Sequence, residues 1–237
     1  MESNVFYFIH GFPDGAEVWS ALKDLCLGTS YTFDLSQIKK PESGADLVAA
    51  HLGVLAPALA AKKKIIIVSH DLGVPQAWAL APYLGSSLEA MVCINGLSPQ
   101  QFHSRLRNPQ QLLKSWYMAP FLTPGVGAMT IAFGRKLLEK KLRQCGWQGQ
   151  PQRFSDYYLY SILGRGLFRK ARTSSKVLQI SASEDPFLLP VTVAEMQLVA
   201  DRFEIEITPG GHWLQLEKPE WLAQRIAEFL KGVHEKN

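Results

Sequence analysis

The sequence predicts an α/β fold in which a doubly wound, mostly parallel sheet of about six strands carries a helical insertion. Three observations lead to this fold class. Short apolar runs alternate with helical patterns up to Asn95, the alternation returns after Ser175, and only helical patterns lie between. The length of 237 residues suits one such domain and is short for two independent enzymes.

Six short apolar runs have the length and composition of buried parallel strands. They are residues 5–9, 31–35, 65–69, 90–95, 176–181 and 203–208. The last run, FEIEIT, alternates apolar and polar residues, so we expect it at an edge of the sheet.

Helical patterns separate or follow these runs. They are Ala16–Leu25, Ala45–Ala61, Val74–Leu84, Val193–Ala200 and Glu220–Val233. Ligands in such folds bind at the carboxyl ends of the strands. We therefore expect residues 1–98 and 176–237 to form the core, and residues 99–175 to form a helical lid over that edge.

Composition indicates an ordinary globular protein, with 47% hydrophobic residues, 19% charged residues and a net charge of +4. The basic cluster RKLLEKKLR at 135–143 alternates with leucines and predicts an amphipathic surface helix, so we expect neither a nucleic-acid nor a membrane partner.

Cys26, Cys93 and Cys145 lack metal-ligand spacing, so reduced thiols and no metal are expected. The apolar run Val5–Ile9 is too short for a signal peptide or a membrane span, which favours a cytoplasmic protein.

The segment SHDLG at 69–73 follows the third apolar run and precedes a helical pattern. Its small-x-nucleophile-x-small pattern is typical of a strained strand-to-helix turn that exposes its central side chain. Here that residue is Asp71, which could be a nucleophile. An aspartate that caps the following helix would also fit the pattern.

Three further stretches bear on this choice. Phe12, in HGFP after the first strand, and Leu72 would supply backbone N–H groups for an oxyanion. Asp185 follows the strand after the insertion, and His212 follows the final strand. The order of nucleophile, acid and histidine is that of an α/β-hydrolase, which favours a catalytic Asp71.

The chain resembles the epoxide hydrolase and dehalogenase branch of the α/β-hydrolases. The matching motifs are HGFPD at 10–14 with Trp19, SHDLG at 69–73, ASEDP at 182–186 and GGHW at 210–213. The resemblance implies an enzyme without cofactor, in which Asp71 forms an alkyl ester and His212, oriented by Asp185, activates water. These families usually carry about two strands before the HGFP strand, so we expect a sheet trimmed at its N-terminal side.

The resemblance to epoxide hydrolases is the stronger one. Haloalkane dehalogenases place Trp directly after the nucleophile and often Asn after HG, where this chain has Leu72 and Phe12. The segment SWYMAPFLTPG at 115–125 resembles the epoxide hydrolase segment whose tyrosine protonates the opening ring, which implies this role for Tyr117. Packing of Tyr117 in an aromatic helix face is the alternative.

A second lid tyrosine is expected in DYYLY at 156–160. We favour Tyr160, then Tyr157, which lies one helical turn away, with Tyr158 as the remaining candidate.

The predicted function is thus the opening of an apolar organic epoxide by water. The alternatives are a hydrolytic dehalogenase, in which Trp116 would donate its indole N–H to the halide, and a ligand-binding protein with a hydrolase pocket. His10 is expected to brace the oxyanion loop, while His70 and Trp213 could line the pocket.

Overall fold

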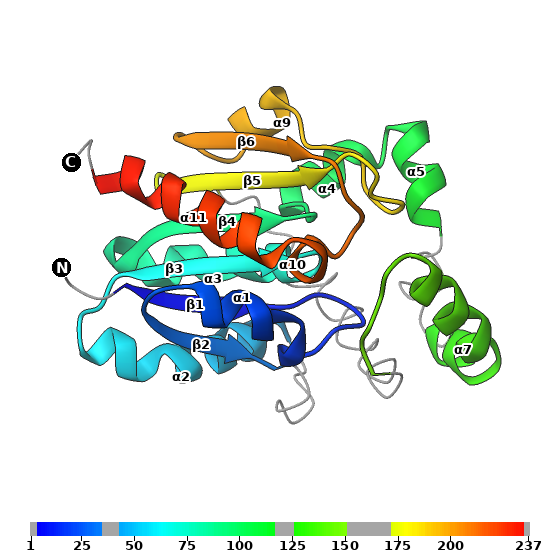
Figure 1. Ribbon diagram of the computed structural model, residues 1–237, viewed down its shortest axis with the longest axis horizontal. Coiled ribbons are helices and arrows are strands. Elements are labelled where there is room, and N and C mark those ends of the chain that lie inside the picture. Colours follow the sequence, from blue (N-terminus) through cyan, green and yellow to red (C-terminus); the bar gives the residue numbers. More distant parts are fainter. Residues whose placement is uncertain (1–3, 35–42, 117–125, 151–171, 235–237) are drawn as a thin grey trace.

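A computed structural model describes residues 4–34, 43–116, 126–150 and 172–234 of the chain. Its centre is a six-stranded sheet in the order β2-β1-β3-β4-β5-β6, and the pairings between these strands are all parallel (Figure 1). The strands are β1 Val5–Ile9, β2 Thr29–Phe33, β3 Ile65–His70, β4 Leu88–Ile94, β5 Lys176–Ala182 and β6 Phe203–Thr208. The predicted parallel sheet is confirmed, and β6 lies at an edge as expected.

The helices agree with the sequence patterns in most places. They are η1 Ala16–Trp19, α1 Ser20–Leu25, α2 Gly44–Ala60, α3 Gly73–Leu84, η3 Gly85–Ser87, α4 Pro99–Arg105, α5 Pro109–Ser115, α7 Val126–Gln144, α9 Val193–Gln197, α10 Leu214–Glu217 and α11 Pro219–His234. Within the described ranges, no helix combines the length and the apolar character needed to cross a membrane.

Three predicted boundaries are wrong by two residues or more, and pairing with other segments explains them. The second strand was expected at 31–35 but lies at 29–33, because its pairing with β1 runs out where Ile9 meets Phe33. The fourth strand was expected at 90–95 but lies at 88–94, where Leu88 already pairs with Ile65 of β3. The helix α9 ends at Gln197 rather than Ala200. Beyond it the chain turns, and Ala200 forms a parallel bridge with Thr173 that a helix could not form.

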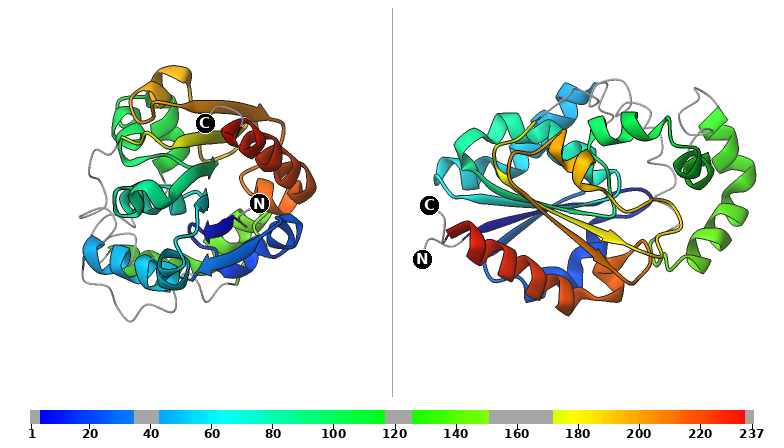
Figure 2. Two further views of the ribbon diagram at one scale, coloured as in Figure 1. Left: turned by 90° about the vertical axis from the view of Figure 1, so that its left-hand side faces the viewer. Right: turned by 90° about the horizontal axis from the view of Figure 1, so that it is seen from above.

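Helices cover both faces of the sheet (Figure 2). The helices α2, α3 and α9 pack on one face, and α1 and α11 pack on the other. Within β3, Ile65 and Ile67 face the first layer, while Ile66 and Val68 face the second. Because both faces are covered, the strand is a continuous apolar run rather than an alternating one.

The carboxyl ends of the strands point toward one side of the molecule, where α5 and α7 lie (Figure 1). These two helices and α4 belong to the segment between β4 and β5. The basic cluster at 135–143 falls within α7, as the sequence predicted.

A buried polar chain links the core to the start of α3. The Tyr7 hydroxyl lies 2.7 Å from His51 Nδ1, and His51 Nε2 lies 3.1 Å from Gln76 Oε1. Gln76 then donates its Nε2–H to the Leu72 carbonyl at 3.0 Å. Since Gln76 Oε1 can only accept, His51 Nε2 carries the proton and Nδ1 accepts from the tyrosine. Burial lowers the pKa of His51 to about 3, so its ring is neutral.

This neutral histidine should make the fold sensitive to mild acid. The folded pKa of His51 lies below its ordinary value of 6.5, so its stabilising effect is present above pH 6.5 and is lost as the pH falls toward 3. Lowering the pH from 6.5 to about 5 should remove about 2 kcal/mol through this group. Urea unfolding at both pH values measures the loss. The His51→Gln variant keeps a donor and an acceptor but cannot titrate, so it should lose less stability than the wild type; equal losses would contradict the prediction.

Candidate active site

The turn between β3 and α3 has the geometry expected of the SHDLG segment. Asp71 has a positive φ of 48°, and Ser69 before it is fully buried. A side chain at Gly73 would clash with the carbonyl oxygens of Ile9 and His10, so only glycine fits there. The first residue outside α3 is Leu72, and it makes no side-chain cap. Asp71 is therefore not the cap of this helix, which was the alternative interpretation of the sequence.

Two backbone N–H groups point at the Asp71 carboxylate. The Phe12 N–H donates to Asp71 Oδ2 at 3.1 Å, and the Leu72 N–H also bonds the carboxylate. Phe12 comes this close because Gly11 beside it has no side chain; a Cβ at Gly11 would lie 2.6 Å from Asp71 Oδ2. Burial raises the pKa of Asp71, and the charges of His212 and His70 together with both N–H groups oppose this effect.

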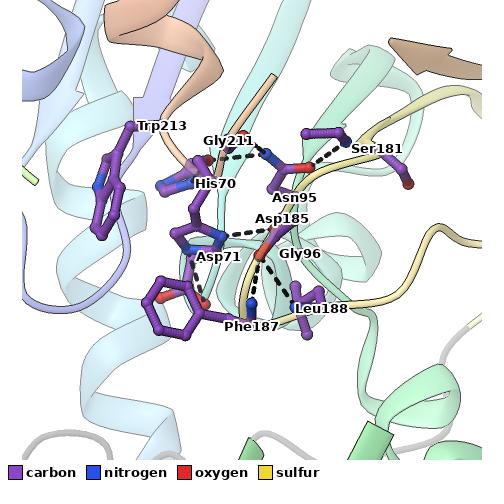
Figure 3. Close-up of polar contacts among 12 residues, drawn as sticks. His70, Asp71, Asn95, Gly96, Ser181, Asp185, Phe187, Leu188, Gly211 and Trp213 are labelled. Atoms are coloured by element: carbon purple, nitrogen blue, oxygen red, sulfur yellow. Dashed lines mark hydrogen bonds and ion pairs between the residues drawn. The ribbon is translucent and has the colours of Figure 1, made fainter. Parts of the chain in front are cut away.

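His212 and Asp185 lie beside Asp71 although they are far from it in sequence. His212 follows β6, and its Nδ1 lies 2.7 Å from Asp185 Oδ2. Its Nε2 lies 4.0 Å from Asp71 Oδ1. The second oxygen of Asp185, Oδ1, accepts the backbone N–H groups of Phe187 at 2.7 Å and Leu188 at 3.0 Å (Figure 3). The imidazole thus stands between two carboxylates, and each of them accepts two backbone N–H groups.

The charges of this group stabilise one another. Burial alone would lower the pKa of His212, but the charge and hydrogen bond of Asp185, followed by the charges of Asp71 and Asp14, raise it to about 9. Burial would likewise raise the pKa of Asp185. The His212 charge and the three hydrogen bonds to its carboxylate hold that pKa below its ordinary value instead.

Asn95 is a residue at this site that the sequence analysis missed. It directly follows β4, has a positive φ of 40°, and donates to the His212 carbonyl at 2.8 Å and the Gly211 carbonyl at 3.1 Å. Its Oδ1 accepts the Ala182 N–H at 2.7 Å. Asn95 therefore joins the ends of β4 and β5 to the loop that carries His212 (Figure 3). A polar residue ending a buried apolar run was the available signal.

Asp14, the last residue of HGFPD, is a third carboxylate that acts on His212, and its side chain is buried. Its oxygens accept the indole N–H groups of Trp147 at 3.1 Å and Trp213 at 3.0 Å. His70 Nδ1 lies 3.5 Å away, and His70 Nε2 donates to the His212 carbonyl at 2.9 Å. His70 and Trp213 were expected as possible pocket residues. Both side chains are buried: His70 bonds the His212 carbonyl, and Trp213 bonds Asp14.

The other predicted residues divide into two groups. His10 is buried, and its Nδ1 lies 2.9 Å from the Gly11 carbonyl, a position suited to bracing the loop before Phe12. Trp116 directly follows α5 and is exposed. The predicted lid tyrosines lie outside the described residues; these are Tyr117, Tyr157, Tyr158 and Tyr160.

The described ranges contain no group of three His, Cys, Asp or Glu side chains that could hold a metal ion. Cys26, Cys93 and Cys145 are free thiols.

The titration of His212 tests this electrostatic arrangement. The NMR signal of labelled His212 should titrate at a pKa of about 9 in the wild type. It should titrate at a lower pKa in Asp71→Asn, and lower still in Asp185→Asn, because Asp185 contributes most. A raised folded pKa stabilises the fold below pH 6.5, and this stabilisation is lost as the pH rises through about 9. An unshifted pKa in both variants would contradict the arrangement.

Comparisons with known proteins agree with the fold. Residues 6–225 match the alpha/beta hydrolase family. Epoxide hydrolase 1 of Caenorhabditis elegans is 24% identical over 70% of this chain, and epoxide hydrolase 3 of Mus musculus is 27% identical over 72%. The matches cover 48% and 53% of those proteins, so the chain spans about half the length of these curated relatives.

Solved structures share the fold at low sequence identity. An epoxide hydrolase of Bacillus megaterium in complex with an inhibitor has a TM-score of 0.74 and 20% identity, covering 96% of this chain and 93% of its own. A haloalkane dehalogenase loop variant from Bradyrhizobium elkanii has a TM-score of 0.71 and 19% identity, with coverages of 99% and 91%. The chain therefore belongs to the alpha/beta hydrolase family, in which it is distantly similar in sequence to epoxide hydrolases and shares its fold with a haloalkane dehalogenase.

Proposed function

We propose that this protein opens an epoxide to a vicinal diol through an ester formed on Asp71. The observation that carries the proposal is the alignment of Asp71, His212 and Asp185. The carboxylate is held at a strained turn toward two N–H groups, and the ring of His212 lies within 4.0 Å of it. A carboxylate nucleophile suits attack on a saturated carbon, whereas an ordinary esterase in this fold uses serine.

In the first step, an Asp71 oxygen forms a bond to an epoxide carbon, and the bond between that carbon and the ring oxygen breaks. The ring oxygen takes a proton from a tyrosine hydroxyl. The resemblance to epoxide hydrolases suggests two tyrosines that donate to this oxygen. The first is Tyr117, and the second is Tyr160 or, as the next choice, Tyr157. They would belong to a helical lid formed by residues 99–175, which lies between β4 and β5.

In the second step, His212 Nε2 takes a proton from water, and the resulting hydroxide attacks the Asp71 carbonyl carbon. The N–H groups of Phe12 and Leu72 stabilise the negative oxygen of the tetrahedral intermediate. The bond between the former carbonyl carbon and the diol oxygen then breaks, the departing alkoxide takes the proton of the added hydroxide and leaves as the diol, and the Asp71 carboxylate is restored. The proton held by His212 returns the tyrosinate of the first step to its hydroxyl form. Esterification also removes the Asp71 charge, which is one of the charges that raise the pKa of His212. Ester formation therefore shifts His212 toward the neutral form that can act as a base.

A hydrolytic dehalogenase is the second candidate, because the same fold and the same carboxylate serve that reaction and a haloalkane dehalogenase is among the structural relatives. The residue after Asp71 is Leu72, which offers a halide no indole N–H. The exposed Trp116 is the remaining candidate donor. Halide release from haloalkanes, with epoxides left intact, would favour this alternative. A protein that only binds ligands would release neither product.

The ester can be trapped by removing the base. We expect His212→Gln to accumulate one covalent adduct on Asp71 when it is treated with an apolar epoxide such as styrene oxide, and to release diol at least about a hundredfold more slowly. Intact-protein mass spectrometry should show the added mass of one epoxide, and peptide mapping should place it on Asp71. The matched control is Asp71→Asn with His212→Gln, which should gain no mass. Adduct on that double variant, or diol release by His212→Gln at the wild-type rate, would contradict the ester mechanism.

A single turnover in ¹⁸O-labelled water is an independent test. The wild-type enzyme in excess over epoxide should give an unlabelled first diol, because the added oxygen comes from Asp71, and the label should appear in the Asp71 carboxylate. Labelled diol in the first turnover would indicate direct attack by water.

A further inference from the structure

The segment that carries Asp185 is held by the first helices after β4. We define the acid loop as residues 185–190, which follow β5. Gln111 and Lys114 of α5 and Arg105 at the end of α4 all bond backbone atoms of this loop. Helices that begin the insertion between β4 and β5 thus contact the loop at the other end of that insertion.

Gln111 is the central residue of this contact. Its side chain is buried, its Nε2–H donates to the Phe187 carbonyl at 2.8 Å, and its Oε1 accepts the Leu189 N–H at 3.0 Å. The amide therefore brackets the two residues whose N–H groups, Phe187 and Leu188, hold Asp185 Oδ1. A shift of Gln111 would move the donors that orient the carboxylate.

Arg105 holds Gln111 and the far end of the acid loop. Its buried guanidinium pairs with both oxygens of Glu195 at 2.6 and 2.8 Å. It also donates to Gln111 Oε1 at 3.1 Å, to the Leu189 carbonyl at 2.6 Å and to the Pro190 carbonyl at 2.8 Å. All the donor groups are used, so the position of the arginine is fixed by planar geometry.

Lys114 adds a contact on the catalytic side. Its Nζ donates to the Asp185 carbonyl at 2.5 Å, and its side chain is only partly buried. This contact can therefore be removed without opening a cavity in the core.

We propose that Gln111, oriented by Arg105, is a positioning residue that fixes the acid loop and thereby the alignment of Asp185 with His212. The proposal deepens the proposed function and rests on it, because the alignment of Asp185 matters for the water-activating step. Ester formation on Asp71 depends instead on the turn after β3 and on the N–H groups of Phe12 and Leu72. The bonds of Gln111, Arg105 and Lys114 to the acid loop do not involve these groups. Loosening the loop should therefore slow ester hydrolysis and spare ester formation.

The test compares Gln111→Leu with the wild type in single turnovers of styrene oxide. We expect ester hydrolysis to slow about ten- to hundredfold, with ester formation within about twofold of the wild-type rate, so that the adduct on Asp71 accumulates. The matched control is Gln110→Leu. Gln110 precedes Gln111 in α5, its side chain is exposed and it bonds no atom of the acid loop, so this control makes the same substitution in the same helix without removing a contact to the loop. It should leave both steps unchanged.

A second readout needs no substrate. The NMR titration of His212 reports its contact with Asp185, and the other charged or titratable groups around the ring are Asp71, Asp14 and His70. None of these three bonds Gln111, so a lower titration midpoint in Gln111→Leu than in Gln110→Leu would show a change at Asp185. Lys114→Met serves if Gln111→Leu does not fold. It should slow ester hydrolysis by a smaller factor, and only this readout applies to it, because the change also removes a positive charge beside Asp185.

The outcomes separate the two proposals. If the wild type turns over the epoxide but Gln111→Leu slows both steps equally, or shifts neither step nor the His212 titration, the positioning role is wrong and the proposed function stands. If the wild type forms no ester with epoxides, the proposed function is wrong, and the His212 titration alone decides whether Gln111 positions Asp185.

Discussion

The left-handed backbone at Asp71 is the constraint on which the rest of the site depends. Such a conformation costs about 1–3 kcal/mol and persists only where neighbouring groups determine it. Here the Asp71 N–H donates to the Ile94 carbonyl at 3.2 Å, and the Val74 N–H donates to the Asp71 carbonyl at 3.0 Å. Gly11 and Gly73 remove the side chains that would block the turn. This turn conformation places the Asp71 carboxylate at the edge of the sheet formed by the carboxyl ends of the strands.

Three carboxylates then raise the pKa of His212, and each has its own N–H donors. Without them, three negative charges in a region of low dielectric would be costly. The donors are the N–H groups of Phe12 and Leu72 for Asp71, those of Phe187, Leu188 and His212 for Asp185, and the indoles of Trp147 and Trp213 for Asp14. The backbone and indole donors carry no formal charge, so they hydrogen-bond the carboxylate oxygens without adding a permanently charged Lys or Arg. His212 therefore remains the titratable partner of two of the carboxylates, Asp185 and Asp71.

The sequence predicted the sheet and the main triad candidates because their signals are local. A buried parallel strand is a short apolar run, and the SHDLG turn needs small residues at fixed positions around Asp71. The contacts of Asn95, Asp14 and Gln111 were missed for the opposite reason. Each of these residues bonds partners more than 70 residues away, and nothing in the neighbouring sequence distinguishes Gln111 from an ordinary helical glutamine. The boundary of β2 was likewise set by its pairing with β1 rather than by its own apolar residues.

The contacts that hold His212 in place do not depend on the charge of its ring. Its backbone carbonyl is held by Asn95 at 2.8 Å and by His70 at 2.9 Å, and neither bond depends on whether the His212 ring carries a proton. Its ring bonds Asp185 through Nδ1, which is a donor in both the cationic form and the relevant neutral form. In the proposed mechanism His212 is charged in one step and neutral in the next, and these contacts keep it in the same place in both. Only Nε2, which faces Asp71, changes, and the Asp71 charge that favours its proton disappears when an ester forms. In the proposed mechanism the two carboxylates thus have different roles: Asp185 fixes the tautomer throughout, while the charge state of Asp71 determines when His212 can accept a proton from water.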